Sequence, residues 1–416
     1  EAALLAGLAP DGGLYLPRPV PALPADWRDA RSPADLGARV LPPYVGAEQA
    51  AVEPLLRDAL DFPMPLVPLS RDRYVLELFH GPTLAFKDVG ARTMARLLAA
   101  AARRRGERLT ILVATSGDTG SAVADAFKGF ELVRVALFYP EGMVSEMQER
   151  QLTVARPGVQ AFRVRGSFDD CQRLVKGAFS DPALAGLRLS SANSINVGRL
   201  LPQSLYYLWG ALQLGRLRGD AAEPVVAVPS GNLGNLTGGM LAARMGLGVK
   251  RFLAAHNVND YFPEFLEGRA SAYAFRPTRA SLSNAMDVGA PSNFERLLAL
   301  LGDALPKRVW GVSVDDDATL TRMADSAERD GYLPCPHTAV ALEALERYRL
   351  HSGDARPAMV LASAHPAKFP NAVQRAIGRP APRSAALDAL LEAERRVEPL
   401  AADPAAMREA LLAFAA

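Results

Sequence analysis

Cysteine and histidine are scarce in this sequence of 416 residues, and their scarcity excludes several kinds of site. The two cysteines, Cys171 and Cys335, form no Cys-x-x-Cys pair, so we expect neither a disulfide framework nor a zinc site. The five histidines include no pair at i and i+4 with a glutamate between them, which leaves a helical metal site unsupported. These counts predict a protein of a reducing compartment, the cytoplasm, with no bound metal.

Long apolar runs and an excess of one charge sign are also lacking. No apolar stretch approaches the roughly 20 residues that span a bilayer, and the chain opens without a basic segment typical of a signal peptide. Because Glu1 is not an initiator methionine, we expect the true first residues to be missing. The formal charge of +2 gives no strong field, and no arginine run is interleaved with aromatic residues. Neither a membrane nor a nucleic acid is therefore an expected partner.

Length and composition indicate a soluble enzyme with two α/β domains, because 416 residues exceed one ordinary core. A hydrophobic content of 49% with 22% charged residues is typical of globular proteins. Strands and helices alternate, as in parallel sheets that are covered on both faces. The expected strands are 110–114, 132–138, 225–228, 309–314 and 358–362. The expected helices are 89–105, 119–128, 145–155, 198–214, 236–245, 316–330 and 337–350.

The predicted division of the chain has three parts. Segment 1–79 is rich in proline and is expected to pack on the body as short elements that form no core. Segment 80–190 is expected to form a smaller α/β domain, and segment 191–416 a larger one. Completion of one domain by chain from both ends stays open.

Lysine is the scarce basic residue: six lysines stand among 47 basic residues, which leaves 41 arginines. An arginine guanidinium stays protonated and cannot form an imine, whereas a desolvated lysine amine can. A lysine retained in such a chain therefore indicates that its amine is needed. Lys87 is the candidate, in the run His80-Gly81-Pro82-Thr83-Leu84-Ala85-Phe86-Lys87-Asp88. An ordinary surface lysine is the alternative interpretation.

A hydroxyl-rich turn joins the expected strand 110–114 to the next helix, in the run Thr115-Ser116-Gly117-Asp118-Thr119-Gly120-Ser121. Free backbone N–H groups and the positive end of the helix dipole favour a carboxylate or phosphate at such a turn. The alternative is simple N-capping, for which Ser, Thr and Asp are the preferred residues. Three hydroxyls and two glycines around one acid exceed what a cap needs, so we favour an anion site.

A glycine-rich turn, Gly231-Asn232-Leu233-Gly234-Asn235, follows the apolar strand 225–228. Its glycines let successive amides converge on one oxyanion, which predicts a phosphate seat. No Gly-Lys-Ser/Thr follows, and the spacing differs from the dinucleotide motif Gly-x-Gly-x-x-Gly, so a nucleotide is disfavoured. Together with Lys87, this turn indicates pyridoxal phosphate chemistry.

The full set of motifs resembles the threonine synthase family, from near residue 1 to about residue 370. The order of the blocks along the chain makes the resemblance specific, although single blocks recur in other pyridoxal enzymes of fold type II. The matching blocks are 7–17, His80–Asp88, Thr115–Ala122, Ser191–Gln203, Pro229–Asn235, Asn284–Asn293 and Ala364–Phe369.

This resemblance implies a fold-type II α/β architecture, like the tryptophan synthase β subunit, with pyridoxal 5'-phosphate in a cleft between two domains. It implies conversion of O-phospho-L-homoserine and water into L-threonine and phosphate, the last step of threonine biosynthesis. Lys87 would be the catalytic residue, bonded to the cofactor. The other cofactor-binding residues would be Phe86, Asp118, Gly231, Asn232, Leu233, Gly234, Asn235 and Ser363. Ser363 stands where the family commonly has threonine, and its neutral hydroxyl would meet the pyridine nitrogen.

The substrate carries a carboxylate and a phosphate, so two further anion seats are expected. The turn with Ser116, Gly117 and Thr119 is predicted to hold the carboxylate. Ser194, Asn196 and Arg199 are predicted to hold the phosphate, since arginine offers a forked donor to oxyanions, and Asn293 and Lys368 are weaker candidates. A solvated Arg199 at the start of an amphipathic helix is the alternative.

Other functions stay open at this stage. A related phospho-lyase or a serine or threonine dehydratase would release a 2-oxo acid instead of threonine. A relative that binds pyridoxal phosphate without turnover is more remote, because Lys87, Asp118, the glycine-rich turn and a hydroxyl at Ser363 are all retained. Monomer and homodimer are equally compatible with the sequence.

Overall fold

The computed structural model describes residues 1–115, 117–220 and 223–415, which form two compact units. This division differs from the predicted one of 1–79, 80–190 and 191–416, because the strand Val397–Ala401 joins the sheet of unit 1 and the strands Leu66–Leu69 and Arg73–Glu77 join the sheet of unit 2. Unit 1 contains Glu1–Tyr15, Lys87–Arg199 and Arg383–Ala416, and unit 2 contains Leu16–Phe86 and Leu200–Pro382.

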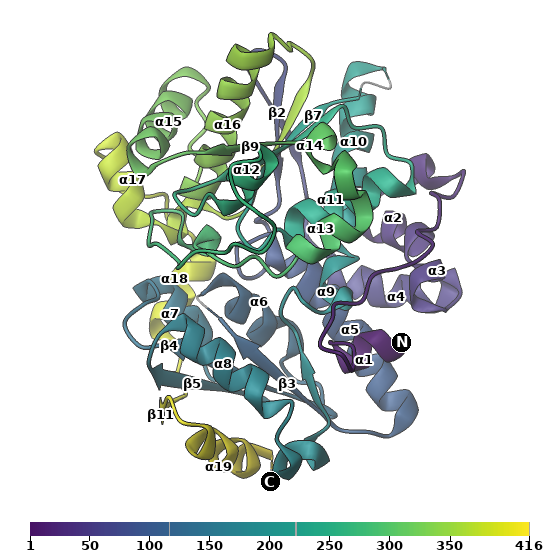
Figure 1. Ribbon diagram of the computed structural model, residues 1–416, viewed down its shortest axis with the longest axis vertical. Helices are drawn as coiled ribbons and strands as arrows, with labels where there is room; N and C mark the ends of the chain where they lie inside the picture. The colour runs from purple at the N-terminus through teal and green to yellow at the C-terminus, as the bar shows by residue number, and fades with distance from the viewer. Residues whose placement is uncertain (116, 221–222, 416) are drawn as a thin grey trace. The chain divides into compact units, whose positions relative to one another are not determined.

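Unit 1 is built on a five-stranded sheet in the order β11-β5-β4-β3-β6, in which all neighbours pair in parallel (Figure 1). The sequence predicted β3 and β4 but not β5, the short strand β6 or the edge strand β11. The strands are β3 (Leu109–Ala114), β4 (Val133–Pro140), β5 (Val159–Arg165), β6 (Leu189–Ser191) and β11 (Val397–Ala401).

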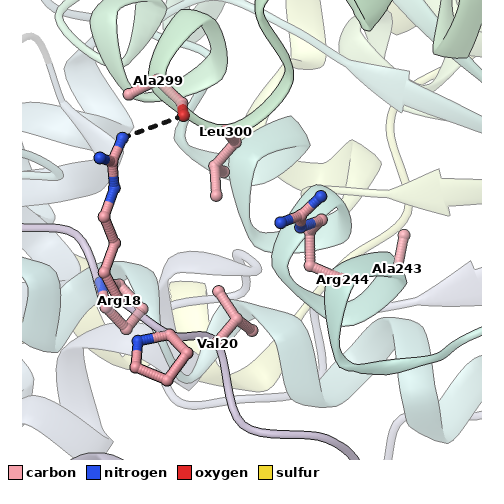
Figure 2. Close-up of a pocket in the computed structure, with 8 residues that line it drawn as sticks. Arg18, Val20, Ala243, Arg244, Ala299 and Leu300 are labelled. Atoms are coloured by element: carbon pink, nitrogen blue, oxygen red, sulfur yellow. Dashed lines mark hydrogen bonds between the residues drawn. The ribbon is translucent and has the colours of Figure 1, made fainter.

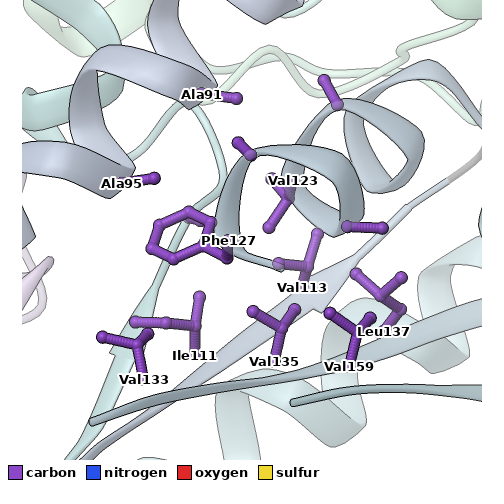
Figure 3. Packing of buried hydrophobic residues seen from close by; sticks show 14 of the residues in the cluster. Ala91, Ala95, Ile111, Val113, Val123, Phe127, Val133, Val135, Leu137 and Val159 are labelled. Carbon is purple, nitrogen blue, oxygen red and sulfur yellow. The ribbon is translucent and has the colours of Figure 1, made fainter. Parts of the chain in front are cut away.

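Side chains of β3 alternate between two separate apolar layers, as a parallel sheet covered on both faces requires. Ile111 and Val113 pack with helices α5 (Lys87–Arg105) and α6 (Asp118–Phe127), and Figure 3 shows this layer around Phe127. Leu112 packs on the other face, with helices α8 (Phe168–Ala178) and α19 (Pro404–Ala415). The remaining helices of unit 1 are α1 (Ala2–Ala6), α7 (Glu146–Thr153), η2 (Pro182–Leu187), α9 (Val197–Leu200) and α18 (Ala385–Glu392).

Unit 2 is built on a six-stranded sheet in the order β1-β2-β10-β7-β8-β9. Only the edge pair β1 and β2 is antiparallel. Helix α16 (Pro336–Ser352) covers one face, and α10 (Gln203–Arg218) and α11 (Gly234–Met245) approach the other at glycines. The strands are β1 (Leu66–Leu69), β2 (Arg73–Glu77), β7 (Val225–Pro229), β8 (Arg251–His256), β9 (Val309–Ser313) and β10 (Ala358–Ala362).

Most of the proline-rich segment, from Leu16 onward, belongs to unit 2, where its helix α2 (Pro33–Val40) packs on α10, whereas Glu1–Tyr15 belongs to unit 1. Helices α2 and α4 (Gln49–Ala59) pack together and bury Leu36 and Leu56. Proline stands at the first turn of α2 and in the edge strand β1, where it is tolerated, whereas Pro54 lies inside α4. The other helices of unit 2 are η1 (Trp27–Asp29), α3 (Pro42–Val45), α12 (Tyr261–Leu266), η3 (Asn284–Met286), α13 (Phe294–Leu301), η4 (Gly302–Ala304), α14 (Leu305–Arg308), α15 (Asp316–Arg329), η5 (Pro366–Lys368) and α17 (Pro370–Ile377).

The predicted strands are all present, and so are the predicted helices with one exception. The helix expected at 198–214 is broken into α9 and α10, because Pro202 cannot donate the backbone hydrogen bond that would continue α9. Among the described residues, no helix has the length and apolarity to cross a membrane, and no cluster of three or more His, Cys, Asp or Glu side chains could hold a metal ion.

Candidate active site

The loop that leads to Lys87 is fixed by backbone and side-chain hydrogen bonds within unit 2. The amide of Phe86 donates to the carbonyl of Ser363 at 2.8 Å, and the Nζ of Lys368 donates to the carbonyl of Thr83 at 3.0 Å. Leu84 has a φ of 57°, a left-handed conformation that is costly for leucine, and its carbonyl accepts from the amide of His365. Lys87 then begins helix α5, so the constrained loop determines where its amine is presented.

The hydroxyl-rich turn of unit 1 is organised by Thr115, a residue outside the predicted site set. Its Oγ1 accepts from the amides of Gly117 at 3.0 Å and Gly120 at 2.8 Å. Gly117 has a φ of 137°, and a Cβ there would lie 2.6 Å from the side chain of Gln148. Only glycine therefore fits this position. The half-buried Thr119 follows in the first turn of α6, whereas Ser116 lies outside the described residues.

Asp118 begins helix α6 and is buried in unit 1. Its Oδ1 accepts a hydrogen bond from the Nε2 of Gln148 at 3.3 Å. Gln148 is itself fixed by a capping box with Ser145 at the start of α7. Helix α7 thus fixes the carboxylate of Asp118 through Gln148. Asp118 itself stands at the N-terminal end of α6, where the helix dipole stabilises negative charge.

Arg199 is buried in unit 1, with 3% of its surface exposed, so the alternative of a solvated arginine is wrong. Its Nη1 donates to the carbonyl of Ala192 at 2.7 Å. A Cβ on Gly90 would lie 2.7 Å from the carbonyl oxygen of Arg199, so Gly90 permits the close approach of α5 and α9. Arg199 therefore packs against α5 at Gly90, about one turn after the helix begins at Lys87.

Asn196 fixes the segment that carries Ser194 and Arg199. Its Nδ2 donates to the carbonyls of Leu4 and Ser191, both at 2.9 Å, and its Oδ1 accepts from the amide of Gly198 at 2.8 Å. Ser194 is half-buried two residues earlier. Both polar atoms of the Asn196 side chain make hydrogen bonds to backbone groups of the fold, which supports a positioning role for this residue.

The glycine-rich turn of unit 2 joins β7 to α11. The amide of Ser230 donates to the carbonyl of Ala255 at 2.8 Å, which ends the strand pairing. Leu233 then adopts a φ of 60°, and α11 begins at Gly234 without a side-chain cap. A Cβ on Gly231 would lie 2.7 Å from the Cα of Met286, so the turn passes against another backbone. An uncapped helix N-terminus after such a turn fits a phosphate group.

Asn235 has a buried donor that also fits an anionic or polar ligand. Its Oδ1 accepts from the hydroxyls of Tyr206 at 2.6 Å and Tyr207 at 2.7 Å. Burial raises the pKa of Tyr207 well above its usual value, so this hydroxyl remains a donor. The Nδ2 of Asn235 is buried and has no hydrogen-bond partner among the described residues. The two tyrosines therefore orient an unsatisfied N–H donor at the start of α11, as a cofactor seat requires.

The remaining predicted residues of unit 2 lie around the same turn or behind the loop before Lys87. The Nδ2 of Asn293 donates to the carbonyl of Asn232 at 3.1 Å, and its Oδ1 accepts from Arg296 at 2.7 Å. Ser363 follows β10 and is buried beside Phe86. Lys368 is fully buried and holds the loop carbonyl of Thr83. Asn293 and Lys368 thus have contacts that position site segments.

Sequence patterns predicted few of the residues that support these turns. Tyr206 and Tyr207 stand as a pair with polar hydroxyls within the apolar run 205–212, which is a detectable signal. Gln148 and Arg296 lie in ordinary amphipathic segments, and only the fold brings them to Asp118 and Asn293.

The class of the protein follows from these features and from comparison with known families. A lysine at a helix start, a glycine-rich turn before an uncapped helix and a buried serine near the lysine loop are the features expected of a pyridoxal phosphate site. Residues 60–363 match the family described as pyridoxal-phosphate dependent enzyme. The chain is therefore a pyridoxal-phosphate-dependent enzyme of fold type II.

The flanking regions define the particular family. Residues 1–59 match the threonine synthase N terminus, and residues 338–411 match the threonine synthase C-terminal family. The chain is 42% identical to threonine synthase of Serratia marcescens over 405 residues, which cover 94% of this chain and 91% of that relative. The chain therefore belongs to the threonine synthase family, whose members are pyridoxal-phosphate-dependent lyases.

Solved structures agree with this assignment. Threonine synthase from Escherichia coli superposes with a TM-score of 0.91 at 38% identity, covering 99% of this chain and 96% of that one. The structure of PLP bound threonine synthase from Brucella melitensis gives a TM-score of 0.90 at 37% identity, covering 100% of this chain and 96% of that one. The predicted family, fold class and cofactor are confirmed.

Proposed function

We propose that this enzyme converts O-phospho-L-homoserine and water into L-threonine and inorganic phosphate. The observation that carries the proposal is the pair of threonine synthase matches, 1–59 and 338–411, that flank and overlap the pyridoxal phosphate match. The central match alone defines only the cofactor class. The reaction needs a proton carrier, a seat for the cofactor and two seats for the substrate anions, and this chain has candidates for each.

Cofactor binding is assigned to the two turns and to the ends of the neighbouring strands. The amides of Gly231, Asn232, Leu233, Gly234 and Asn235 hold the phosphate of pyridoxal phosphate, with the Nδ2 of Asn235 as an additional donor. Asp118 would face the 3-hydroxyl group, and Phe86 would contact the ring. Ser363 offers a neutral hydroxyl to the pyridine nitrogen. A neutral partner leaves that nitrogen largely unprotonated, in contrast to an aspartate.

Proton transfer is assigned to Lys87. Its Nζ would hold the cofactor covalently and would be free to act as a base when the substrate amine takes its place. When bound, pyridoxal phosphate supplies a conjugated system that delocalises the negative charge left on the substrate after proton removal. The released Nζ of Lys87 then takes the proton from Cα and serves the second proton removal at Cβ. Phosphate leaves from Cγ, and a proton is added to Cγ. Water then adds its oxygen to Cβ, and a proton returned to Cα gives threonine.

The substrate anions are assigned to unit 1. The turn formed by Ser116, Gly117 and Thr119 binds the carboxylate through backbone amides and hydroxyls. Ser194 and Arg199 bind the phosphate, since a buried guanidinium is a forked donor to oxyanions. Asn196 positions these two residues, as its three hydrogen bonds within the fold support. Asn293 and Lys368 remain weaker candidates for direct contact.

We place the enzyme in the cytoplasm. Both cysteines, Cys171 and Cys335, are buried free thiols, which suits a reducing compartment. Burial raises the pKa of Cys171 to about 12, so this thiol stays protonated and unreactive.

The function is tested by mixing the purified protein with pyridoxal phosphate and O-phospho-L-homoserine, and by assaying phosphate, threonine and 2-oxobutanoate in the same samples. Equal amounts of phosphate and threonine are expected. Phosphate with 2-oxobutanoate in place of threonine would identify a phospho-lyase. No phosphate release despite bound cofactor would refute the assigned substrate.

A further inference from the structure

A cavity of about 610 Å³ lies in unit 2, apart from every residue assigned above. Figure 2 shows the side chains of Val20 and Leu300 between those of Arg18 and Arg244. This volume falls within the range of small-molecule sites, about 300–1,000 Å³. The residues that line the cavity are Pro17, Arg18, Pro19, Val20, Ala243, Arg244, Ala299 and Leu300.

The lining combines positive charge with apolar surface and contains no carboxylate. Arg18 is held in place because its Nη2 donates to the carbonyl of Ala299 at 3.2 Å, drawn as a dashed line in Figure 2. Arg244 stands in the last turn of α11. Within the described part of the chain, neither guanidinium has an ion-pair partner. A guanidinium carries five N–H donors, so one carbonyl leaves most of the donors of Arg18 for a ligand.

The cavity is distinct from the phosphate-binding turn. Arg244 lies near the C-terminal end of α11, whereas the turn precedes Gly234 at its N-terminal end. The helix has 12 residues, so about 18 Å separate its two ends. Ala299 and Leu300 likewise lie at the C-terminal end of α13, which begins after Asn293. Helices α11 and α13 contact each other.

The C-terminal ends of these helices carry negative partial charge, which by itself would repel an anion. Two full positive charges outweigh these partial charges of about half a unit per helix. Since no acidic side chain lines the space, the local potential is positive. Apolar groups from Pro17, Val20 and Leu300 complete the wall, so a ligand with a hydrocarbon portion gains burial that a bare ion does not.

We propose that this cavity binds a small organic oxyanion, a phosphate ester or carboxylate with a short hydrocarbon chain, between Arg18 and Arg244. Each guanidinium donates to the oxyanion, and the proline, valine and leucine side chains contact the hydrocarbon. The site is separate from the threonine synthase reaction. Its test therefore measures binding and does not depend on turnover.

The experiment titrates the holoenzyme with butyl phosphate, butyrate and inorganic phosphate by isothermal titration calorimetry. The variants are Arg18→Gln, Arg244→Gln and the double variant. Arg375→Gln is the matched control, because Arg375 is also an exposed arginine in the last turn of a unit 2 helix but lies outside the cavity. We expect each single variant to bind the favoured organic probe about tenfold more weakly, since one charge-assisted interaction is lost. The control is expected to match the unmodified enzyme.

The two organic probes distinguish a phosphate ligand from a carboxylate ligand, and preference for either supports the site. Equal binding of inorganic phosphate and butyl phosphate would overturn the hydrocarbon part of the proposal. Equal affinities in all variants, or no binding of either organic probe, would overturn the site. Phenylglyoxal labelling of the unmodified holoenzyme gives a check that needs no variant: the favoured probe should protect Arg18 and Arg244 but not Arg375, and equal labelling with and without it would contradict the proposal.

Discussion

Replacing Gly231 with alanine tests the proposed phosphate-binding turn most directly. The added Cβ would lie 2.7 Å from the Cα of Met286 and 3.1 Å from its carbonyl carbon and oxygen. These are backbone atoms of a buried residue in η3, so they cannot rotate away. The turn must move instead. Overpacking of this kind costs about 1–3 kcal/mol of the free energy of unfolding.

The displaced turn would also misalign the amides assigned to the cofactor phosphate. Loss of one hydrogen bond to a charged group costs about 2 kcal/mol, which corresponds to roughly 30-fold weaker binding of pyridoxal phosphate. We would measure the dissociation constant by titrating the apoenzyme and following absorbance. Urea unfolding of the apoenzyme gives the change in stability independently of the cofactor.

Gly177→Ala is the control for adding one methyl group to a glycine. Gly177 lies in α8, its added Cβ would meet no atom within 4 Å, and its backbone is not left-handed. We expect unchanged cofactor affinity and a stability equal to or up to about 1 kcal/mol above that of the unmodified enzyme. If Gly231→Ala bound the cofactor within twofold of the unmodified enzyme at unchanged stability, the assignment of this turn as a tightly packed phosphate seat would be wrong.

Three further predictions address other parts of the site and the fold. Lys87→Ala should abolish turnover and the visible absorption band of the covalently bound cofactor; a retained band would exclude Lys87 as the attachment point. Arg199→Ala should raise the KM for O-phospho-L-homoserine about 10- to 100-fold with a smaller effect on kcat, because a charged donor to the phosphate is lost; unchanged kinetics would remove Arg199 from the substrate site. Burial lowers the pKa of His256 to about 4 from its usual 6.5, so this imidazole is neutral in the folded protein at pH 7 while the unfolded chain takes up a proton below pH 6.5. Stability should therefore fall by up to about 3 kcal/mol as the pH drops from 6.5 to 4. This part of the pH dependence should be absent in His256→Asn. If urea unfolding gave the same loss of stability between pH 7 and pH 4.5 in both proteins, the reasoning would be refuted.

Local sequence determined much of the architecture and of the candidate site. The buried strands β3, β7 and β10 read as continuous apolar runs, because a parallel sheet covered on both faces has no polar side. The turns after β3 and β7 were predicted from glycine and hydroxyl residues, since these residues meet backbone requirements that few others can. Lys87 was predicted because an amine has chemistry that a guanidinium lacks.

Tertiary structure decided what depends on distant pairing. The sequence divided the chain at residues 79 and 190, but β2 pairs with β10 almost 300 residues later, and β11 pairs with β5 across more than 200 residues. Strand β6 has only three residues, too few to show a period of its own, and β2 is bounded by the charged residues Arg73 and Glu77, so it does not stand out as an apolar run. Their partners define them, and only the folded chain supplies those partners.

The same reason separates the predicted site residues from their supports. Glycine, lysine and hydroxyl residues have chemistry or backbone freedom that is visible in one position of a sequence. Gln148 beside Asp118, and Arg296 beside Asn293, have neither. Their roles arise from hydrogen bonds between separate segments, because a buried polar side chain must find a partner wherever the fold provides one.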